Sequence, residues 1–202
     1  MTINILAFLI AYFICSINFA IIITKLVKGE DIRKFGSGNA GTTNSIRVMG
    51  KFWGIMTFIG DICKTIIAYY LIYLIAKLFN IEYDISARSF YLVGAIIGHC
   101  YPVYYKFKGG KGVATTIAAM MLINKEVTLV AIIVGVIITV ISRMISLASI
   151  SAMILLNVMA FVMLPEYILP IFIITIIIIY KHKENIDRII KGKENKLFER
   201  RK

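Results

Sequence analysis

Residues 52–78 read FWGIMTFIGDICKTIIAYYLIYLIAKL, and this stretch decides the fold class. It is apolar almost throughout, and as an α-helix it exceeds the ~20 residues that cross the ~30 Å hydrocarbon core of a bilayer. The whole chain has the same character, because 59% of its 202 residues are hydrophobic and its mean hydropathy is +0.85. A single water-soluble core does not bury that much apolar surface. The sequence therefore predicts an all-α integral membrane protein.

Further apolar segments lie on both sides of this one. The seven predicted transmembrane helices cover residues 3–26, 52–78, 90–105, 113–123, 127–141, 147–164 and 167–180. The fourth is too short to cross as a straight helix. It either extends back through Gly112 or starts below the surface in a locally thinned, water-accessible region. We expect one integral membrane domain over residues 1–202, in which residues 181–202 form a basic tail.

The basic residues predict the orientation of the chain. With the N-terminus outside and seven crossings, only Lys77, Arg88 and Lys125 of the 23 lysines and arginines fall in outer loops, and Lys64 lies inside a segment. The reverse orientation would violate the positive-inside rule heavily, so we expect the C-terminal tail in the cytoplasm. The same rule accounts for the net charge of +12, which therefore does not indicate a nucleic-acid partner.

Three polar stretches precede helices that start at the predicted cytoplasmic face. They are GSGNAGTTNSIR at residues 36–47, KGGKGVATT at residues 108–116 and SRMISLAS at residues 142–149. The start of a helix presents unpaired N–H groups and partial positive charge. Glycine-rich loops at such places suit the binding of an anion such as phosphate. We expect the three helix starts to converge on an anion site.

Three other patterns in the sequence are excluded by their context. GSGNAG fits GxGxxG, with Asp61 about twenty residues further on, but membrane segments surround it where a dinucleotide fold needs a βαβ unit. KGGKG lacks the glycine spacing of a Walker A loop. His182 and Asp187 form H-x4-D, a pattern of acyl-CoA-dependent glycerolipid acyltransferases. The soluble domain and the proline-glutamate-glycine block of that family are absent, so we interpret the match as chance.

Ionisable residues inside the membrane segments allow two interpretations. Asp61 and Lys64 lie one turn apart on the same face of a helix. Such a pair either serves the site or neutralises itself as part of the scaffold. For His99, a hydrogen bond to a neighbouring helix is the favoured interpretation. In the tail, the near-helical spacing of isoleucines and a leucine predicts a short amphipathic helix at an anionic membrane surface; these are Ile186, Ile189, Ile190 and Leu197.

Taken together, four stretches resemble the bacterial acyl-phosphate:glycerol-3-phosphate acyltransferases, the PlsY family. They are GSGNAGTTNSIR, GHCYPVYYKFKGGKGVATT, SLAS and HKENIDRIIKGKEN, in the family's order and spread over the whole chain. Thr42 stands where the family usually has alanine. The resemblance implies a multi-pass enzyme of the bacterial inner membrane whose active site faces the cytoplasm. It implies transfer of a fatty acyl group from acyl phosphate to the 1-hydroxyl of glycerol 3-phosphate, giving lysophosphatidic acid and phosphate.

Both of these substrates carry phosphate, so the site needs more than one anion-binding group. Arginine can grip phosphate with two hydrogen bonds, lysine supplies a point charge, and glycine lets the backbone approach closely. The predicted substrate-binding residues are Asn39, Thr43, Arg47, Lys108, Gly109, Gly110, Lys111 and, by the resemblance, Ser146. The predicted catalytic residues are Ser37, His182 and, by the resemblance, Asn185. We expect Glu194 to be structural and to pair with a basic residue.

His182 is the candidate general base, since the pKa of an imidazole lies near working pH. Alternatively, a substrate phosphate takes the hydroxyl proton, and His182 only positions the substrate. Because acyl phosphate is an activated mixed anhydride, positioning and charge neutralisation can suffice, and we expect no covalent acyl-enzyme. We expect membrane lipids around the chain but no metal, cofactor, coenzyme A or acyl carrier protein. The alternative function is a transporter of anions or phosphate esters. The sequence argues against it, because the hydrophobic segments show no inverted repeat.

Overall fold

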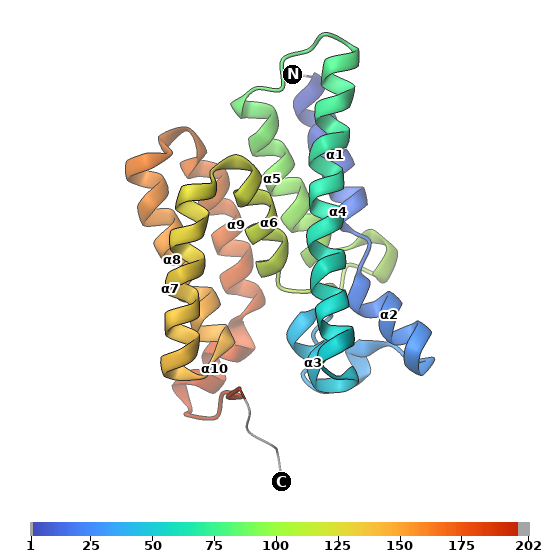
Figure 1. The fold of residues 1–202 in the computed structure, drawn as a ribbon, viewed down its shortest axis with the longest axis vertical. Helices are drawn as coiled ribbons and strands as arrows, with labels where there is room; N and C mark the ends of the chain where they lie inside the picture. The colour runs from blue at the N-terminus through green and yellow to red at the C-terminus, as the bar shows by residue number, and fades with distance from the viewer. Residues whose placement is uncertain (1, 198–202) are drawn as a thin grey trace. The chain divides into compact units, whose positions relative to one another are not determined.

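The computed structural model describes residues 2–197, and every regular element in that range is helical (Figure 1). This confirms the predicted all-α class. By packing, the chain forms two compact units, Met1–Ile123 and Asn124–Lys202. That the whole chain acts as one domain stays a prediction. The last basic residues of the predicted tail, Arg200 to Lys202, lie outside the described residues.

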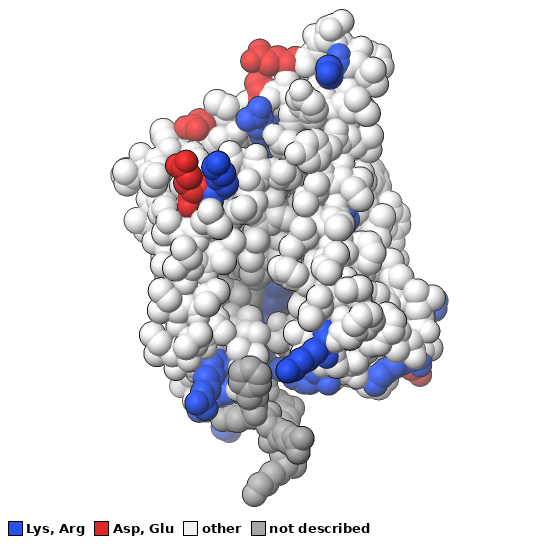
Figure 2. All heavy atoms as spheres, in the orientation of Figure 1, with Lys and Arg blue, Asp and Glu red and all other residues white. Residues whose placement is uncertain are grey.

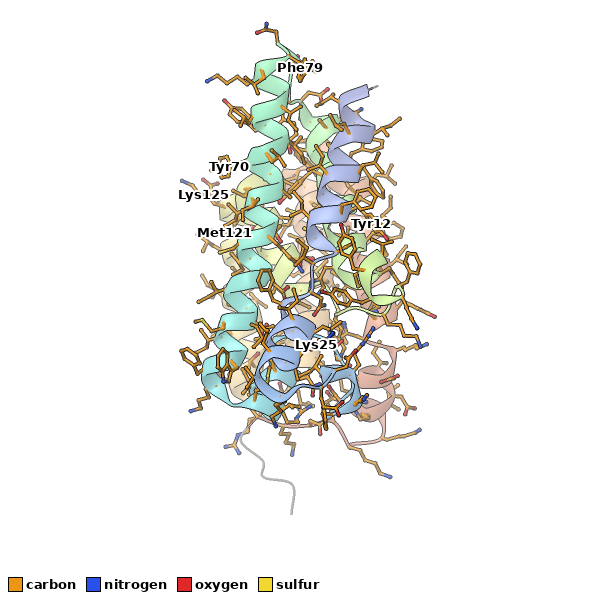
Figure 3. The ribbon with its side chains drawn as sticks, turned by 90° about the vertical axis from the view of Figure 1, so that its right-hand side faces the viewer. Tyr12, Lys25, Tyr70, Phe79, Met121 and Lys125 are labelled. Atoms are coloured by element: carbon orange, nitrogen blue, oxygen red, sulfur yellow. The ribbon has the colours of Figure 1, made fainter. Side chains whose placement is uncertain are left out.

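Unit 1 is a group of helices that carries α2, α3 and the turn η1 at one end. In Figure 1, α1, α4, α5 and α6 run alongside one another, and α2 and α3 lie at one end of them. Figure 3 shows Phe79 directly after one end of α4 and Lys25 of α2 toward the other end of the unit. The helices are α1 (Thr2–Cys15), α2 (Phe19–Lys28), α3 (Thr42–Met49), α4 (Lys51–Leu78), α5 (Ile85–Cys100) and α6 (Val113–Ile123), with 3-10 turns η1 (Ile32–Lys34) and η2 (Val103–Tyr105).

Unit 2 holds the remaining helices. In it, α8 packs on α7 and α9, and the short α10 packs on α8 and α9. The Asn157 amide of α8 donates a hydrogen bond to the Thr175 hydroxyl of α9 at 2.5 Å, which gives two polar side chains in an apolar helix pair their partners. The elements are α7 (Lys125–Ser142), α8 (Ile145–Met163), η3 (Pro165–Tyr167), α9 (Ile168–Lys181) and α10 (Lys183–Ile190). A tail helix is therefore present as α10, which contains Ile186, Ile189 and Ile190, whereas Leu197 lies beyond its end.

The lengths of the helices support a multi-pass membrane protein. Within the described residues, four helical stretches are long and apolar enough to cross a bilayer: Ile3–Lys28, Lys51–Leu78, Lys125–Ser142 and Ile145–Met163. A fifth is formed if Pro165–Lys181 and Lys183–Ile190, which meet at a 60° bend, count as one span. The short α6 begins at Val113 and does not extend back, because Gly112 has a φ of +85°. Most charged side chains visible in Figure 2 lie near the ends of the helices.

Three predicted boundaries need correction. The third apolar segment, predicted at residues 90–105, is a helix over Ile85–Cys100 followed by the 3-10 turn η2. The first apolar segment is broken between α1 and α2, where Asn18 caps α2 by accepting from the Ile21 N–H at 3.0 Å. In addition, the polar stretch 36–47 is a loop only as far as Gly41, since α3 begins at Thr42. Gly50, with a φ of +90°, separates α3 from α4. The helix that starts after the first polar loop is therefore α3 and not the long α4.

A pair of glycines lets α5 approach the backbone of α1. Gly94 and Gly98 lie one turn apart on α5, and a Cβ at Gly94 would stand 2.5 Å from the Phe8 carbonyl oxygen. A Cβ at Gly98 would collide with the carbonyl oxygen of Tyr12, the α1 residue labelled in Figure 3. Small residues four apart are a common device for close contact between membrane helices. The contact between α1 and α5 therefore depends on these two positions.

We expect Gly94→Ala to destabilise unit 1, because the added methyl meets main-chain atoms that cannot move aside. Overpacking of this kind costs about 1–3 kcal/mol. The matched control is Gly135→Ala on α7, where the nearest atom to a new Cβ is 3.8 Å away and alanine is the better helix former by about 1 kcal/mol. Thermal unfolding in detergent should show a lower melting temperature for Gly94→Ala alone. Equal melting temperatures would contradict the packing argument.

Candidate active site

The first loop, residues 29–41, is shaped by one buried side chain. Asn44 lies in the first turn of α3 and is 1% exposed. Its Oδ1 accepts from the Ser37 N–H at 2.9 Å, and its Nδ2 donates to the Phe35 carbonyl at 3.0 Å. Gly36 has a φ of +61°, and a side chain there would collide with Asn44. The loop is therefore fixed in shape before any ligand arrives.

The predicted residues of this stretch lie along the loop and on α3. Ser37, Thr43 and Arg47 are exposed, and Asn39 is half-buried. The residue that precedes α3, Gly41, has no side chain with which to cap the N–H groups of the first turn. Unpaired N–H groups at a helix start attract anions. The stretch thus offers backbone donors, hydroxyls, an amide and a guanidinium.

The second loop, residues 101–112, folds back on the end of α5. The N–H of Gly110 donates to the His99 carbonyl, and that of Gly109 to the Cys100 carbonyl, both at 3.2 Å. A side chain at Gly109 would collide with the His99 carbonyl. A Cβ at Gly110 would collide with the His99 imidazole and lie 2.8 Å from the Ala40 carbonyl oxygen. The two loops therefore meet at Ala40 and Gly110, and the glycines are needed for this contact.

Two lysines of the second loop are among the predicted substrate-binding residues. Lys108 is exposed and Lys111 is half-buried. Lys108 directly precedes Gly109, and Lys111 directly follows Gly110. The two lysines therefore belong to the same short loop as the two closely packed glycines. The structure thus brings the predicted residues of the two loops into one region of unit 1.

Arg33, which the sequence analysis did not single out, holds the two loops together. Its Nη1 donates to the carbonyls of Tyr105 at 2.8 Å and Lys108 at 3.0 Å. The Asp31 carboxylate orients the guanidinium, with an Nη2–Oδ2 distance of 2.6 Å. Hydrogen bonding to Arg33 lowers the pKa of Asp31 below its ordinary value. The carboxylate therefore stays charged at neutral pH, and the pair is lost only in acid.

A buried ionic cluster lies within the same unit. It is formed by Asp61 and Lys64 of α4 and His99 of α5, whose side chains are at most 4% exposed. The Lys64 Nζ lies 2.8 Å from the Asp61 carboxylate, 3.1 Å from the His99 Nδ1 and 2.6 Å from the Ile17 carbonyl oxygen. The contact of His99 with a neighbouring helix is confirmed. The sequence alone did not connect the Asp61–Lys64 pair with His99. In the structure, Lys64 contacts both Asp61 and His99.

In unit 2, the Glu194 carboxylate is the centre of a hydrogen-bond network. Its Oε1 accepts from the Ser146 hydroxyl at 2.8 Å and from the Asn185 amide at 2.6 Å. Its Oε2 accepts from the Arg188 guanidinium at 2.8 Å. Pairing of Glu194 with a basic residue, as expected, is confirmed. The carboxylate thus brings together two predicted site residues from α8 and α10.

His182 stands at the 60° bend between α9 and α10 and is 2% exposed. Its Nδ1 lies 2.8 Å from the Ile178 carbonyl oxygen. Because a carbonyl only accepts, Nδ1 carries the proton, and in the neutral ring the basic lone pair is on Nε2. The backbone N–H of Asn185 donates to the His182 carbonyl at 2.8 Å. The tautomer of a candidate base is therefore set by the fold.

The two residues of the H-x4-D pattern, His182 and Asp187, do not form an acid–base dyad. Asp187 lies on the exposed side of α10, where its carboxylate pairs with Lys191 at 2.8 Å. His182, by contrast, is buried. This supports the interpretation of the pattern as chance.

The predicted residues thus form two groups. Unit 1 carries basic side chains on two loops and the uncapped start of α3, which suits anion binding. Unit 2 carries an imidazole of fixed tautomer, which suits proton transfer, and a hydrogen-bond network around a carboxylate whose charge is matched by arginine. The first group is Ser37, Asn39, Thr43, Arg47, Lys108, Gly109, Gly110 and Lys111, and the second is Ser146, His182 and Asn185.

Comparison with known proteins points to one family. Residues 5–192 match the family model for glycerol-3-phosphate acyltransferase. A glycerol-3-phosphate acyltransferase of Coxiella burnetii is 39% identical over 194 residues, which cover 96% of this chain and 97% of the relative. One from Macrococcus caseolyticus is 40% identical over 195 residues, covering 95% and 96%. The similarity therefore extends over nearly the whole of each protein.

Solved structures agree with these relatives. A crystal structure of PlsY, an integral membrane glycerol 3-phosphate acyltransferase, in its glycerol 3-phosphate form has a TM-score of 0.85 at 36% identity. The lysophosphatidic acid form has a TM-score of 0.81 at 33% identity. Each comparison covers 96% of this chain and 95% of that protein.

We expect Glu194→Gln to loosen the network in unit 2, because an amide places donors against donors and removes the charge that Arg188 matches. Losing hydrogen bonds to a charged group costs about 1.5–3 kcal/mol each. The variant should melt earlier, and trypsin should cleave faster after the exposed Lys191 and Lys193. Glu184→Gln, at an exposed position of α10, is the matched control. Identical melting and cleavage for the two variants would show that the network does not hold the tail.

Proposed function

We propose that this chain, which belongs to the PlsY family of glycerol-3-phosphate acyltransferases, takes its fatty acyl group from acyl phosphate. It is an acyltransferase that acts on glycerol 3-phosphate, and the match over residues 5–192 carries this function. The acyl group goes to the 1-hydroxyl, and the products are lysophosphatidic acid and inorganic phosphate. The proposed donor needs no nucleotide or carrier protein.

The group of residues in unit 1 is proposed to bind the phosphates. Arg47 serves as a two-pronged anchor, and Lys108 and Lys111 add point charge. The N–H groups in the first turn of α3, which Gly41 leaves without a side-chain cap, donate to phosphate oxygens together with the side chains of Ser37, Asn39 and Thr43. The loops are held by Asn44 and Arg33. A site fixed in advance loses less entropy on binding and needs little reorganisation during the reaction.

The group in unit 2 is proposed to handle the proton. The glycerol hydroxyl oxygen forms a bond to the acyl carbonyl carbon, and the bond from that carbon to the phosphate oxygen breaks, so that phosphate leaves with the electron pair. The hydroxyl proton goes to Nε2 of His182, which is the basic nitrogen in the observed tautomer. In the alternative, the proton goes to a substrate phosphate and His182 positions the hydroxyl. Asn185 and Ser146 complete this group through Glu194.

The proposed topology has seven membrane spans, with the N-terminus outside and residues 181–202 in the cytoplasm. Helices occur in all seven apolar segments, and the distribution of lysine and arginine favours this orientation. The active site then faces the cytoplasm of a bacterial inner membrane, and the acyl chain lies between helices and enters from the bilayer. The chain acts as one domain in this proposal.

The donor is tested with purified protein in detergent, acyl phosphate and labelled glycerol 3-phosphate. We expect labelled lysophosphatidic acid to form with no coenzyme A thioester present, because the activated anhydride supplies the acyl group. A parallel reaction with acyl-CoA in place of acyl phosphate should give no product. Product formation only with acyl-CoA would overturn the donor assignment.

The base is tested with His182→Gln, which retains a polar group but no basic nitrogen. If His182 accepts the proton, kcat should fall about 10²–10⁴-fold with little change in KM, as for loss of a general base. A raised KM with a nearly normal kcat would instead assign the proton to a substrate phosphate and leave His182 a positioning role.

A further inference from the structure

The cluster of Asp61, Lys64 and His99 has no part in the proposed chemistry, yet it is the most deeply buried group of ionisable side chains in the described part of unit 1. Charged residues inside membrane segments are costly, and they persist when they serve a site or a partner.

The Lys64 ammonium joins three separate elements. It forms an ion pair with Asp61 one turn earlier on α4, donates to the Ile17 carbonyl in the break between α1 and α2, and contacts the Nδ1 of His99 near the end of α5. An ammonium has donors only and no acceptor. His99 Nδ1 must therefore accept, and the neutral ring carries its proton on Nε2.

One link leads from Lys64 to the first loop. Ile17 is followed directly by Asn18, which is 1% exposed. The Asn18 amide donates to the Ala40 carbonyl at 3.2 Å, while its oxygen caps α2. Lys64 thus holds the break from which Asn18 reaches the end of the loop that carries Ser37 and Asn39.

A second link leads from Lys64 to the second loop through His99. The carbonyl of His99 accepts from the Gly110 N–H at 3.2 Å. The Nε2 edge of its ring lies against the Cα of Gly110, on the side where the Ala40 carbonyl also lies. The ring that Lys64 orients is therefore one wall of the contact between the two loops.

We infer that Lys64, balanced by Asp61, orients His99 and the α1–α2 break so that the two glycine loops keep the spacing that phosphate binding requires. Lys64 and His99 are then positioning residues, which act through Ala40 and Gly110. Arg33 holds the same two loops at a different place, through Tyr105 and Lys108. The inference rests on the proposed function, because it takes these loops as the phosphate-binding surface.

The charge of the cluster is not the means by which it acts. Asp61 and Lys64 cancel each other, and His99 is neutral in the tautomer described. A change that removes both charges at once leaves no unpaired charge in the interior, whereas removal of one partner does. The double variant Asp61→Leu with Lys64→Met therefore separates positioning from simple neutralisation.

We expect the double variant to fold, as judged by a cooperative thermal transition in detergent, but to bind phosphate poorly. The KM for glycerol 3-phosphate or for acyl phosphate should rise roughly tenfold or more, while kcat at saturation changes much less, since a site displaced by a fraction of an ångström loses its best geometry. Lys77→Met, at an exposed position on the same helix, is the control. A folded double variant with wild-type KM for both substrates would overturn the inference.

A second pair of variants decides the matter if the double variant fails to fold. In His99→Asn, the amide oxygen takes the place of Nδ1 and still accepts from Lys64; in His99→Leu, no acceptor remains. We expect His99→Asn to keep most of the phosphate affinity and His99→Leu to lose it. Equal affinities in the two variants would overturn the inference.

Equilibrium binding of inorganic phosphate and of glycerol 3-phosphate, with no acyl donor, separates this inference from the proposed function. If the wild-type protein binds these anions but gives no product with acyl phosphate, only the donor assignment fails, and the variants still test the positioning role. If the wild-type protein binds neither anion, the loops are not phosphate sites and both proposals fail.

Discussion

Wherever a helix breaks inside a membrane protein, the freed backbone groups must find partners within the protein, because the bilayer offers none. In unit 1, the Ile17 carbonyl at the α1–α2 break is satisfied by Lys64, and the Ala40 carbonyl by Asn18. In unit 2, the Ile178 carbonyl before the α9–α10 bend accepts from both the backbone N–H and the Nδ1 of His182. The side chains that meet this constraint are the same ones that shape the loops and fix the tautomer of the candidate base. Structure and site therefore rest on one requirement.

Most of the apolar helices could be predicted from the sequence because each lies in a long apolar run, and the bounds of α6 agree with the predicted residues 113–123. The break between α1 and α2 could not, since the composition stays apolar across it and only Asn18 marks it. The helix α3 was read as loop because its polar residues, such as Thr43 and Asn44, show no apolar stripe. The close contact of α1 and α5 depends on Gly94 and Gly98, whose spacing is a signal that was available.

The residues of the candidate site were predicted from four short stretches and a family resemblance, and the structure brings those of each unit into one region. Arg33 was missed, because it binds the main-chain carbonyls of Tyr105 and Lys108. A carbonyl is present at every position of the chain, so a contact with one leaves no pattern of residue types. Asn44 belongs to one of the four stretches, but no role was predicted for it, because it also binds main-chain groups. Supporting side chains of this kind require coordinates.

An enzyme whose substrates carry phosphate can keep buried or half-buried carboxylates near its motif residues only if their charge is matched, since an unmatched carboxylate repels the substrate and is costly to bury. The three described carboxylates that are not exposed meet this condition. Asp31 pairs with Arg33 at 2.6 Å, Asp61 with Lys64 at 2.8 Å, and Glu194 with Arg188 at 2.8 Å. None of these cations is among those proposed to bind substrate, which are Arg47, Lys108 and Lys111. The chain therefore uses two sets of basic residues, one that neutralises its own acidic groups and holds the loops and the tail, and one that is assigned to phosphate.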